Sequence, residues 1–445
     1  MAKMLNLYKF HKIKNLFQLI LVSILLQVLN SQAQTNVSFM EFNVWQEGTS
    51  VPNGLNKIRD VIIEVNPDIV GFIEVRNYNN EDWTTKILNA LSTEGYHYEG
   101  QFTGGDVSLI SKYPITASSL IYDQAGSIVK YDININNDTV VVVVAHLDYT
   151  YYACYLPRGY NGGYPNWDMI DDGHGNPDPV LDIPYILEYN LESKRDEQIE
   201  AFLNNVQDES DPVILMGDFN EPSYADWSDN NSEMFDHHGL NIPWQNVLTL
   251  IENDFTDAYR AYFPNETTNP GITWPSVADG VGSTSWTPLA DERDRIDYIL
   301  YKGNGIESNF VSLVGPRASY AFDQPDTTYT YNENFMAENL PWPSDHKATF
   351  AILSFSTISG VEQKKGTELF NIYPNPAKGV LNVVLRESSK GVKLRITNTK
   401  GYSLFNATYC NQDIISIDTK TFAKGMYVLE ISSGEKSEKT KFMVD

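Results

Sequence analysis

The stretch PVILMGDFN, residues 212–220, decides the fold of this chain. Its apolar, β-branched half is flanked by acidic residues and is typical of a buried strand. The strand ends in Gly217, Asp218 and Asn220, so a carboxylate and a carboxamide stand at one rim of a sheet. Because Gly, Asp and Asn are also ordinary turn residues, this junction by itself fits a plain strand-to-turn connection equally well.

The same arrangement recurs over residues 36–355. Apolar runs at 37–44, 69–73, 140–145 and 348–355 predict further strands, and helical spacing predicts helices at 55–65 and 195–206. Any single polar residue at a strand end fits a turn or a cap, but six such ends together indicate a site. The polar groups at these ends are Asn43, Glu74, His146, Asp218 with Asn220, Asp297, and Asp345 with His346.

The residue types at these ends favour a hard cation. No cysteine stands among them and the chain has no His-x-x-x-His pair, so a zinc-protease site is disfavoured. Carboxylates combined with amides instead suit an oxygen-loving ion such as Mg²⁺.

The charge is concentrated in the middle of the chain. Residues 34–364 carry 50 acidic and 16 basic side chains, a formal charge of −34. This field repels polyanions and disfavours unassisted binding of DNA or RNA. It suits a protein that holds divalent metals, and it suits salty or extracellular solvent equally well.

The N-terminal segment predicts export. Lysines precede an apolar run at 16–29 that is followed by Ser31-Gln32-Ala33, the pattern of a signal peptide cut after Ala33. A run of 14 residues falls short of the ~20 that span a bilayer, which disfavours a membrane anchor. We therefore expect no transmembrane segment in the mature chain. Cys154 and Cys410 fall in different predicted domains, so no structural disulfide is expected.

Seven short motifs, in order along residues 36–355, resemble the endonuclease/exonuclease/phosphatase superfamily. The resemblance implies an α/β fold: a four-layer α/β sandwich of the DNase I-like type, with two mixed sheets packed together, helices outside, and the site at one rim. The matching motifs are 42–44, 68–75, 111–115, 146–148, 217–220, 295–299 and 344–346.

The resemblance also implies a metal site. Glu74, with Asn43 and Asp345 nearby, matches the principal metal site. Asp218 and Asn220 match residues that contact the phosphate or a second metal ion. The expected ion is Mg²⁺, with Mn²⁺ or Ca²⁺ as alternatives.

The catalytic roles are carried over in the same way. Asp218 matches the residue that orients or deprotonates the attacking water, with Asn220 beside it. His346 matches the catalytic histidine, Asp297 the carboxylate that orients it, and His146 the histidine that contacts phosphate oxygens. An Asp–His pair fixes the imidazole tautomer and stabilises its protonated form, which hydrolysis of a phosphate ester can use.

The sequence departs from the family pattern at several positions. Ile73 precedes Glu74 where the family usually has Gln. Asp106 stands where Asn or a small residue is more usual, so it is either an additional ligand or a neutral substitution. The segment 221–223 lacks the Asn-Tyr-Arg extension of inositol-polyphosphate phosphatases, which argues against that branch.

Three aromatic-rich insertions, at 148–190, after Asn220, and at 263–289, follow motif residues, so we expect them to wall the site. Their rings either stack on a base or sugar or pack the loops themselves. His237 and His238, in the second insertion, are expected to be exposed loop residues.

Residues 368–445 predict a small all-β sandwich after a polar linker at 356–367. Tyr373-Pro374-Asn375-Pro376 and the Lys-Gly-x-Tyr at 424–427 resemble a type IX secretion sorting domain, with a carbohydrate-binding or adhesion module as the alternative. The domains expected are thus a signal peptide (1–33), a catalytic domain (34–355) and the sorting domain (368–445). The resemblance implies a chain that partners the type IX secretion machinery and is secreted or held at the cell surface.

The leading functional hypothesis is a metal-dependent phosphoric ester hydrolase acting on a lipid, sugar or nucleotide ester. The alternative within the class is an extracellular endonuclease, for which nucleic acid is a substrate only. The alternative outside the class is a non-catalytic binding protein on the same fold, which the complete set of strand-end residues disfavours.

Overall fold

The computed structural model describes residues 35–356 except 165, and residues 370–444 except 374, 376, 386–390, 399–401, 411, 413 and 434–435. The predicted signal peptide lies outside the described residues, as does all of the predicted linker except Ser356. Within the described residues, no helix is both long enough and apolar enough to cross a bilayer. Both cysteines are free, with Cys154 buried and Cys410 exposed.

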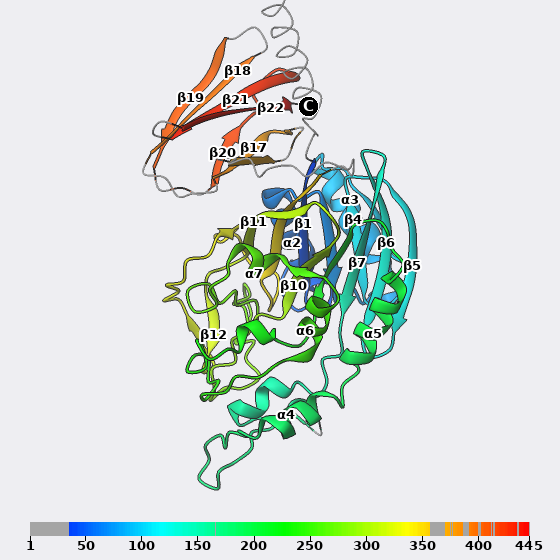
Figure 1. Ribbon diagram of the computed structural model, residues 1–445, viewed down its shortest axis with the longest axis vertical. Helices are drawn as coiled ribbons and strands as arrows, with labels where there is room; N and C mark the ends of the chain where they lie inside the picture. Colours follow the sequence, from blue (N-terminus) through cyan, green and yellow to red (C-terminus); the bar gives the residue numbers. More distant parts are fainter. Residues whose placement is uncertain are drawn as a thin grey trace, which may run out of the picture.

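Residues 35–356 form two sheets with helices outside them (Figure 1). The first sheet has the strand order β14 (Phe335–Met336), β11 (Ile306–Val314), β15 (Ala348–Phe355), β1 (Thr35–Asn43), β2 (Ile69–Ile73), β4 (Val107–Ser111) and β3 (Glu99–Gln101). The second has the order β5 (Ile115–Asp123), β6 (Ser127–Ile135), β7 (Asp138–His146), β8 (Val213–Asp218), β10 (Asp297–Lys302) and β9 (Thr256–Asp257). Both sheets are mixed, since β1 pairs with β2 and β7 with β8 in parallel, among antiparallel neighbours.

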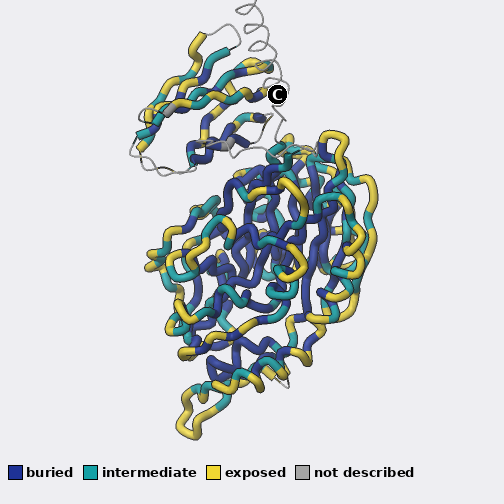
Figure 2. The backbone as a smooth tube through the Cα atoms, viewed as in Figure 1, coloured by how far each residue is buried: buried dark blue, intermediate teal, exposed yellow. Residues whose placement is uncertain are grey.

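Three hydrophobic cores define four layers. One lies between the sheets and contains Phe39, Val144 and Met216. A second joins the first sheet to α2 (Gly54–Val65) and α3 (Trp83–Thr93). A third joins the second sheet to α5 (Arg195–Val206) and α6 (Gln245–Glu252). The structure therefore confirms the predicted four-layer α/β sandwich, and Figure 2 shows the buried backbone concentrated in its sheets.

Strand periodicity explains how the site is positioned. Successive side chains of a strand point to opposite faces, so residues two apart share a face. Val142 and Val144 of β7 and Ile214 and Met216 of β8 fill the core between the sheets. His146 and Asp218 continue these two series at the strand ends, so their side chains lie between the sheets at one rim.

The C-terminal residues form a separate small sandwich, as predicted. One sheet has the order β16 (Phe370–Tyr373), β17 (Val380–Leu385) and β20 (Ile414–Asp418). The other has the order β19 (Ser403–Tyr409), β18 (Val392–Asn398), β21 (Gly425–Ser433) and β22 (Lys436–Val444). Alternating residues of both sheets, such as Leu381 and Leu394, share one core.

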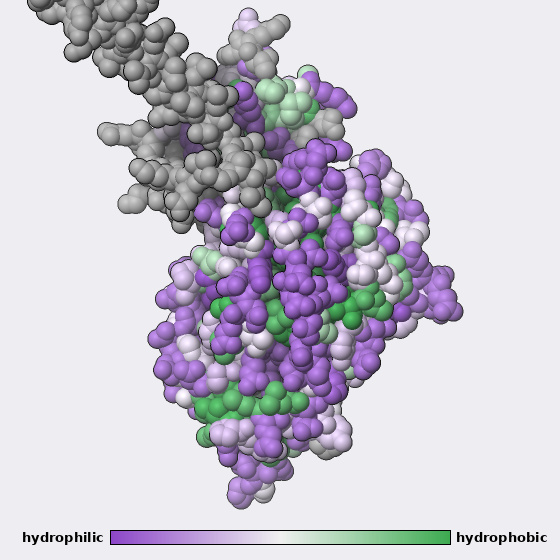
Figure 3. Space-filling model, turned by 45° about the vertical axis from the view of Figure 1, so that its right-hand side comes forward, coloured by the Kyte–Doolittle hydropathy of each residue, from purple (hydrophilic) through white to green (hydrophobic). Residues whose placement is uncertain are grey.

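The remaining elements lie in connecting segments. The first insertion contains α4 (Ile183–Asn190), and α7 (Ala258–Tyr262) packs against β10 and β11. The hairpin of β12 (Ser319–Ala321) and β13 (Gln324–Asp326) follows β11 of the first sheet along the chain. Figure 3 shows a largely hydrophilic surface on this face, with a hydrophobic band across the lower part of the molecule.

Candidate active site

Three neighbouring strands of the second sheet bring the central residues together. Asp218 at the end of β8 pairs in register with His146 at the end of β7 and with Asp297 at the start of β10. Asn43, at the end of β1, belongs to the opposite sheet, and its Nδ2 donates to Oδ2 of Asp218 at 3.0 Å. The site therefore lies where the rims of the two sheets meet.

Asp218 lies between two histidines. Its Oδ2 is 3.7 Å from Nε2 of His346 and 4.0 Å from Nε2 of His146. Its Oδ1 accepts a hydrogen bond from the backbone N–H of Asn220 at 2.9 Å. Burial raises the pKa of Asp218 to about 6, against the opposing charge of His346. The carboxyl group therefore changes protonation near neutral pH, which a proton-accepting role requires.

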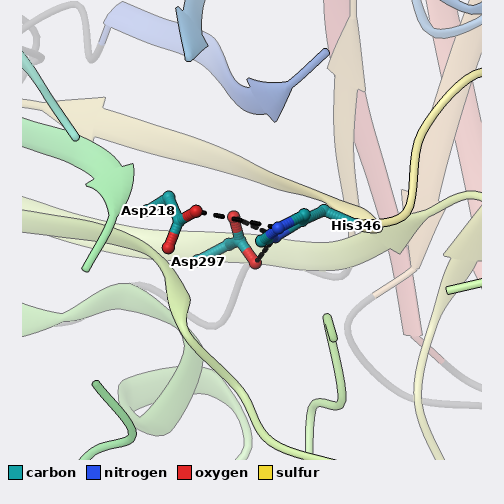
Figure 4. A group of neighbouring side chains, drawn as sticks. All are labelled: Asp218, Asp297 and His346. Atoms are coloured by element: carbon teal, nitrogen blue, oxygen red, sulfur yellow. Dashed lines mark hydrogen bonds and ion pairs between the residues drawn. The ribbon is translucent and has the colours of Figure 1, made fainter. Parts of the chain in front are cut away.

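His346 is fixed by Asp297 and by its own loop. Its Nδ1 lies 3.0 Å from Oδ2 of Asp297, while Nε2 faces Asp218 (Figure 4). The loop is anchored by Ser344, whose hydroxyl donates to the Asn43 carbonyl at 2.7 Å and accepts from the His346 N–H. Burial opposes a charge on His346, but Asp297 and Asp218 outweigh it and hold the pKa of His346 well above its usual range.

His146 has a carboxylate partner of its own. Nδ1 of His146 lies 2.7 Å from Oδ2 of Asp106, and the guanidinium of Arg76 donates to the same carboxylate at 2.7 Å. Burial opposes the charge, yet Asp106 outweighs it and raises the pKa of His146 to about 9. In turn, His146 and Arg76 overcome burial and lower the pKa of Asp106 to about 2. Asp106 was expected to be either an additional ligand or a neutral substitution. In the structure, Asp106 instead pairs with His146 and forms a second Asp–His pair.

Glu74 stands directly after β2 in a strained conformation. Its φ of 64° lies in the left-handed region, which costs a non-glycine residue about 1–3 kcal/mol. The Gln46 N–H donates to its Oε2 at 2.9 Å and Asn43 Nδ2 lies 3.4 Å from its Oε1. This conformation turns the carboxylate toward Asn43 at the rim.

The donor set around Glu74 fits a divalent cation. Asp345 is buried, and burial together with the neighbouring charge of Glu74 raises the pKa of Asp345 to about 8. Two carboxylates that repel one another in a buried site gain stability when a cation lies between them. Carboxylate oxygens of Glu74 and Asp345 match the preference of Mg²⁺, Mn²⁺ or Ca²⁺. The amide of Asn43 turns its Nδ2 toward Glu74 and Asp218, while its Oδ1 accepts from the Trp45 N–H at 2.9 Å.

A second group of ligand atoms is more compact. Among the described residues, oxygens of Asp218 and Asp297 and a ring nitrogen of His346 all lie within 4.8 Å of one another. The short Asp297–His346 contact already occupies part of this group, so we interpret it as the catalytic group of Figure 4. Asn220, also at a positive φ of 47°, turns its Nδ2 to the Leu147 carbonyl at 3.0 Å.

Sequence reasoning missed Glu41 beside the site, and it placed Trp274 only within an insertion that was expected to wall the site. Glu41 is fully buried on β1 with neither carboxylate oxygen bonded, and burial and Asp297 raise its pKa well above the usual range. Its position two residues before Asn43, on the same strand face, was the available signal. Trp274 packs its ring 4.9 Å from that of His346, and no local pattern marks it as a neighbour of this histidine.

The insertions supply both buried and exposed aromatic rings. Buried ones such as Tyr155, Trp227 and Trp274 share a core of their own. Exposed large hydrophobic side chains of the first and third insertions are Tyr149, Tyr164, Leu181, Tyr185, Trp286 and Leu289. The expectation for His237 was wrong: it is 1% exposed because its ring stacks on Trp227 at 3.7 Å, whereas His238 is exposed.

This fold and this site define a class of protein, and sequence comparison gives the same class. The profile of the endonuclease/exonuclease/phosphatase family matches residues 40–346, and the chain belongs to that family. A profile of a secretion system C-terminal sorting domain matches residues 371–445.

Individual relatives are distant. Uncharacterized protein F14F9.5 of Caenorhabditis elegans is 28% identical over 319 residues, covering 72% of this chain and 91% of the relative. Truncated TDP2 of C. elegans has a TM-score of 0.40 at 16% identity, covering 72% of this chain and 98% of that one. The human Nocturnin catalytic domain with bound sulfate has a TM-score of 0.38 at 15% identity, with 73% and 97% covered.

Proposed function

We propose that this chain is a divalent-metal-dependent phosphoric ester hydrolase that acts outside the cell. The observation that carries the proposal is the position of Asp218 between two imidazoles. Its Oδ2 lies 3.7 Å from Nε2 of His346 and 4.0 Å from Nε2 of His146. Each of these histidines is paired with a carboxylate of its own. Membership of the endonuclease/exonuclease/phosphatase family supports a phosphate ester as the substrate class.

In the proposed mechanism, each residue at the rim has a separate role. Asp218 accepts a proton from the attacking water, which its pKa near neutrality allows. His346, held by Asp297, and His146, held by Asp106, keep their charge and stabilise the negative charge that develops on the phosphoryl oxygens. Glu74, Asp345 and Asn43 would hold a divalent cation, which when bound supplies Lewis acidity and offsets the local carboxylate charge.

Export is part of the proposal. The basic and apolar N-terminal segment supports a signal peptide at 1–33, and the sorting-domain match supports recognition by the type IX secretion machinery. The free state of both cysteines is compatible with this route. We therefore propose secretion or attachment at the cell surface, with residues 34–355 as the catalytic domain.

Turnover of bis-p-nitrophenyl phosphate by purified protein with Mg²⁺ tests the proposal. We expect EDTA to abolish the activity and Mg²⁺ to restore it, and we expect His346→Ala to lower kcat by about 100-fold or more. His238→Ala is the matched control, because it removes an exposed imidazole of the second insertion. Wild-type turnover in the His346→Ala variant would overturn the assignment, and inert wild-type protein would favour the binding-protein alternative.

A further inference from the structure

Three aromatic rings from two insertions contact one another in series, and the two outer rings are exposed. Trp167 lies 6.5 Å from Tyr149, with ring planes 17° apart, and 4.8 Å from Trp286. Tyr149 and Trp286 are 55% and 47% exposed, and Trp167 is partly buried between them. We call these three residues the aromatic platform.

The aromatic platform is connected to the catalytic histidine by packed side chains. The ring of Trp274 lies 4.9 Å from that of His346, and its Nε1 donates to the Tyr155 hydroxyl at 3.3 Å. The ring of Tyr155 lies 5.9 Å from that of Trp167. Tyr149 also follows His146 by three residues along the chain, so the backbone connects the platform to the site as well.

Buried polar groups hold the platform in place. The guanidinium of Arg195 donates to the carbonyls of Asp148, Thr150 and Tyr151, at 2.6, 2.9 and 2.8 Å, which fixes the backbone on both sides of Tyr149. Buried Glu292 accepts from the Trp286 N–H at 3.0 Å and from the Tyr155 hydroxyl at 2.6 Å. Rings that remain exposed while their backbone is fixed in this way are preorganised for a ligand.

We propose that the aromatic platform is a substrate subsite that stacks the nucleobase of a small nucleotide ester whose phosphate lies at Asp218. The inference rests on the proposed hydrolase function and names its substrate class. Bases stack on aromatic side chains whatever their sequence, because every base presents a π-face. A small ester also accommodates the formal charge of −34 on residues 34–364, which opposes a polynucleotide.

Two other occupants fit the surroundings less well. A sugar needs hydrogen-bond partners for its hydroxyls, yet Glu292 and Tyr160 beside the platform are already engaged by the backbone N–H groups of Trp286 and Leu289. A membrane surface fits less well because the first insertion is negatively charged: residues 149–191 carry six acidic residues and one basic residue. The hydrogen-bond arrangement therefore disfavours a sugar, and the charge disfavours a membrane surface.

The test compares esters that share the p-nitrophenolate leaving group and differ in the retained group: methyl, thymidine 5′ and glucose 6. We expect wild-type protein to prefer the thymidylyl ester in kcat/KM. Trp286→Ala and Tyr149→Ala should each lower the thymidylyl-to-methyl ratio of kcat/KM by roughly tenfold. Trp286→Phe should retain most of the preference because a ring remains.

Tyr185→Ala is the matched control, since Tyr185 is 50% exposed on the same insertion and outside the platform. It should leave the ratio unchanged. An unchanged ratio in Trp286→Ala, or an equal preference for the glucose ester, would overturn the inference.

Binding measured without turnover separates this inference from the proposed function. Calorimetric titration with thymidine 5′-monophosphate should give an affinity that Tyr149→Ala weakens and Tyr185→Ala does not. If wild-type protein hydrolyses no ester but shows this pattern, the hydrolase proposal fails and the base-stacking surface stands. If it hydrolyses the methyl ester but binds no thymidine nucleotide, the hydrolase stands and the platform assignment fails.

Discussion

At the scale of single residues, the site pairs each histidine with a carboxylate and places Asp218 between the two pairs. Asp297 holds His346 at 3.0 Å and Asp106 holds His146 at 2.7 Å. A carboxylate on Nδ1 fixes the tautomer and favours the imidazolium form. The positive charges then offset the burial of Asp218, which would otherwise carry its negative charge alone in a nearly dry environment.

Asp106→Asn tests the second pair. The carboxylate raises the pKa of His146 to about 9, so wild-type protein keeps the imidazolium up to that pH. An amide cannot stabilise the charge, so the pKa falls and the alkaline limb of the kcat/KM profile should move to lower pH by at least about one unit. At pH 8 we expect a loss of about tenfold or more, with a smaller loss at pH 6.

The control for this change is Asp123→Asn, which makes the same substitution on an exposed carboxylate that accepts from the Ser127 hydroxyl at 3.2 Å. Its pH–rate profile should match that of wild-type protein. If the alkaline limb of the Asp106→Asn profile does not move, the reaction does not need a charge on His146.

Sequence reasoning at this scale succeeds for residues at strand ends and fails for their partners. Asp218, His146 and Asp297 stand at ends of apolar runs, so a local pattern points to them. Asp106 acts through its contact with His146, 40 positions away in the chain. Trp274 acts through its ring contact with His346. Such contacts depend on how distant loops fold back, which no local period encodes.

At the scale of elements, the close pairing of β7 with β8 sets the distance between His146 and Asp218. Gly217 pairs with Ala145, and a Cβ at this glycine would stand 2.1 Å from the Ala145 carbonyl oxygen. A backbone atom cannot rotate out of the way as a side chain can, so only glycine allows this approach. Strand packing therefore requires a glycine at position 217, a residue type that is also compatible with a turn.

Gly217→Ala should therefore displace the ends of both strands. We expect a destabilisation of about 1–3 kcal/mol and a fall in kcat, because the added methyl group overpacks the pair and changes the spacing of the rim. Thermal unfolding and turnover of bis-p-nitrophenyl phosphate measure the two effects. Gly282→Ala, where a Cβ meets no atom within 4 Å, is the control and should leave both unchanged.

The elements themselves were largely predictable, since apolar runs and helical spacing identify β1, β2, β7, β15, α2 and α5. The order of strands within the sheets was not, because it follows from contacts between distant segments. The family resemblance, which the ordered motifs carried, implied the four-layer arrangement but no strand order. The conformation of the insertions could not be predicted, since their aromatic residues serve both as a buried core and as exposed rings.

At the scale of the whole molecule, the proposed catalytic site and the C-terminal sandwich are built on separate cores. The sandwich has its own apolar core around Leu381 and Leu394. Its described contact with the catalytic domain centres on Tyr373, whose ring lies 5.5 Å from Phe350 and whose hydroxyl lies 3.6 Å from the Met336 sulfur. These residues belong to the outer core of the first sheet, on the side of α2 and α3.

The catalytic domain should consequently work without the C-terminal sandwich. Protein comprising residues 34–355 should hydrolyse bis-p-nitrophenyl phosphate with a kcat/KM within about twofold of that of residues 34–445, because no residue proposed for the site lies beyond His346. Its Tm should be lower, since loss of Tyr373 uncovers apolar surface on Phe350 and Met336. Tyr373→Ala in the longer protein should reproduce part of this decrease and leave turnover unchanged. A shorter protein that folds, by circular dichroism, yet has lost turnover would instead make the sandwich part of the enzyme.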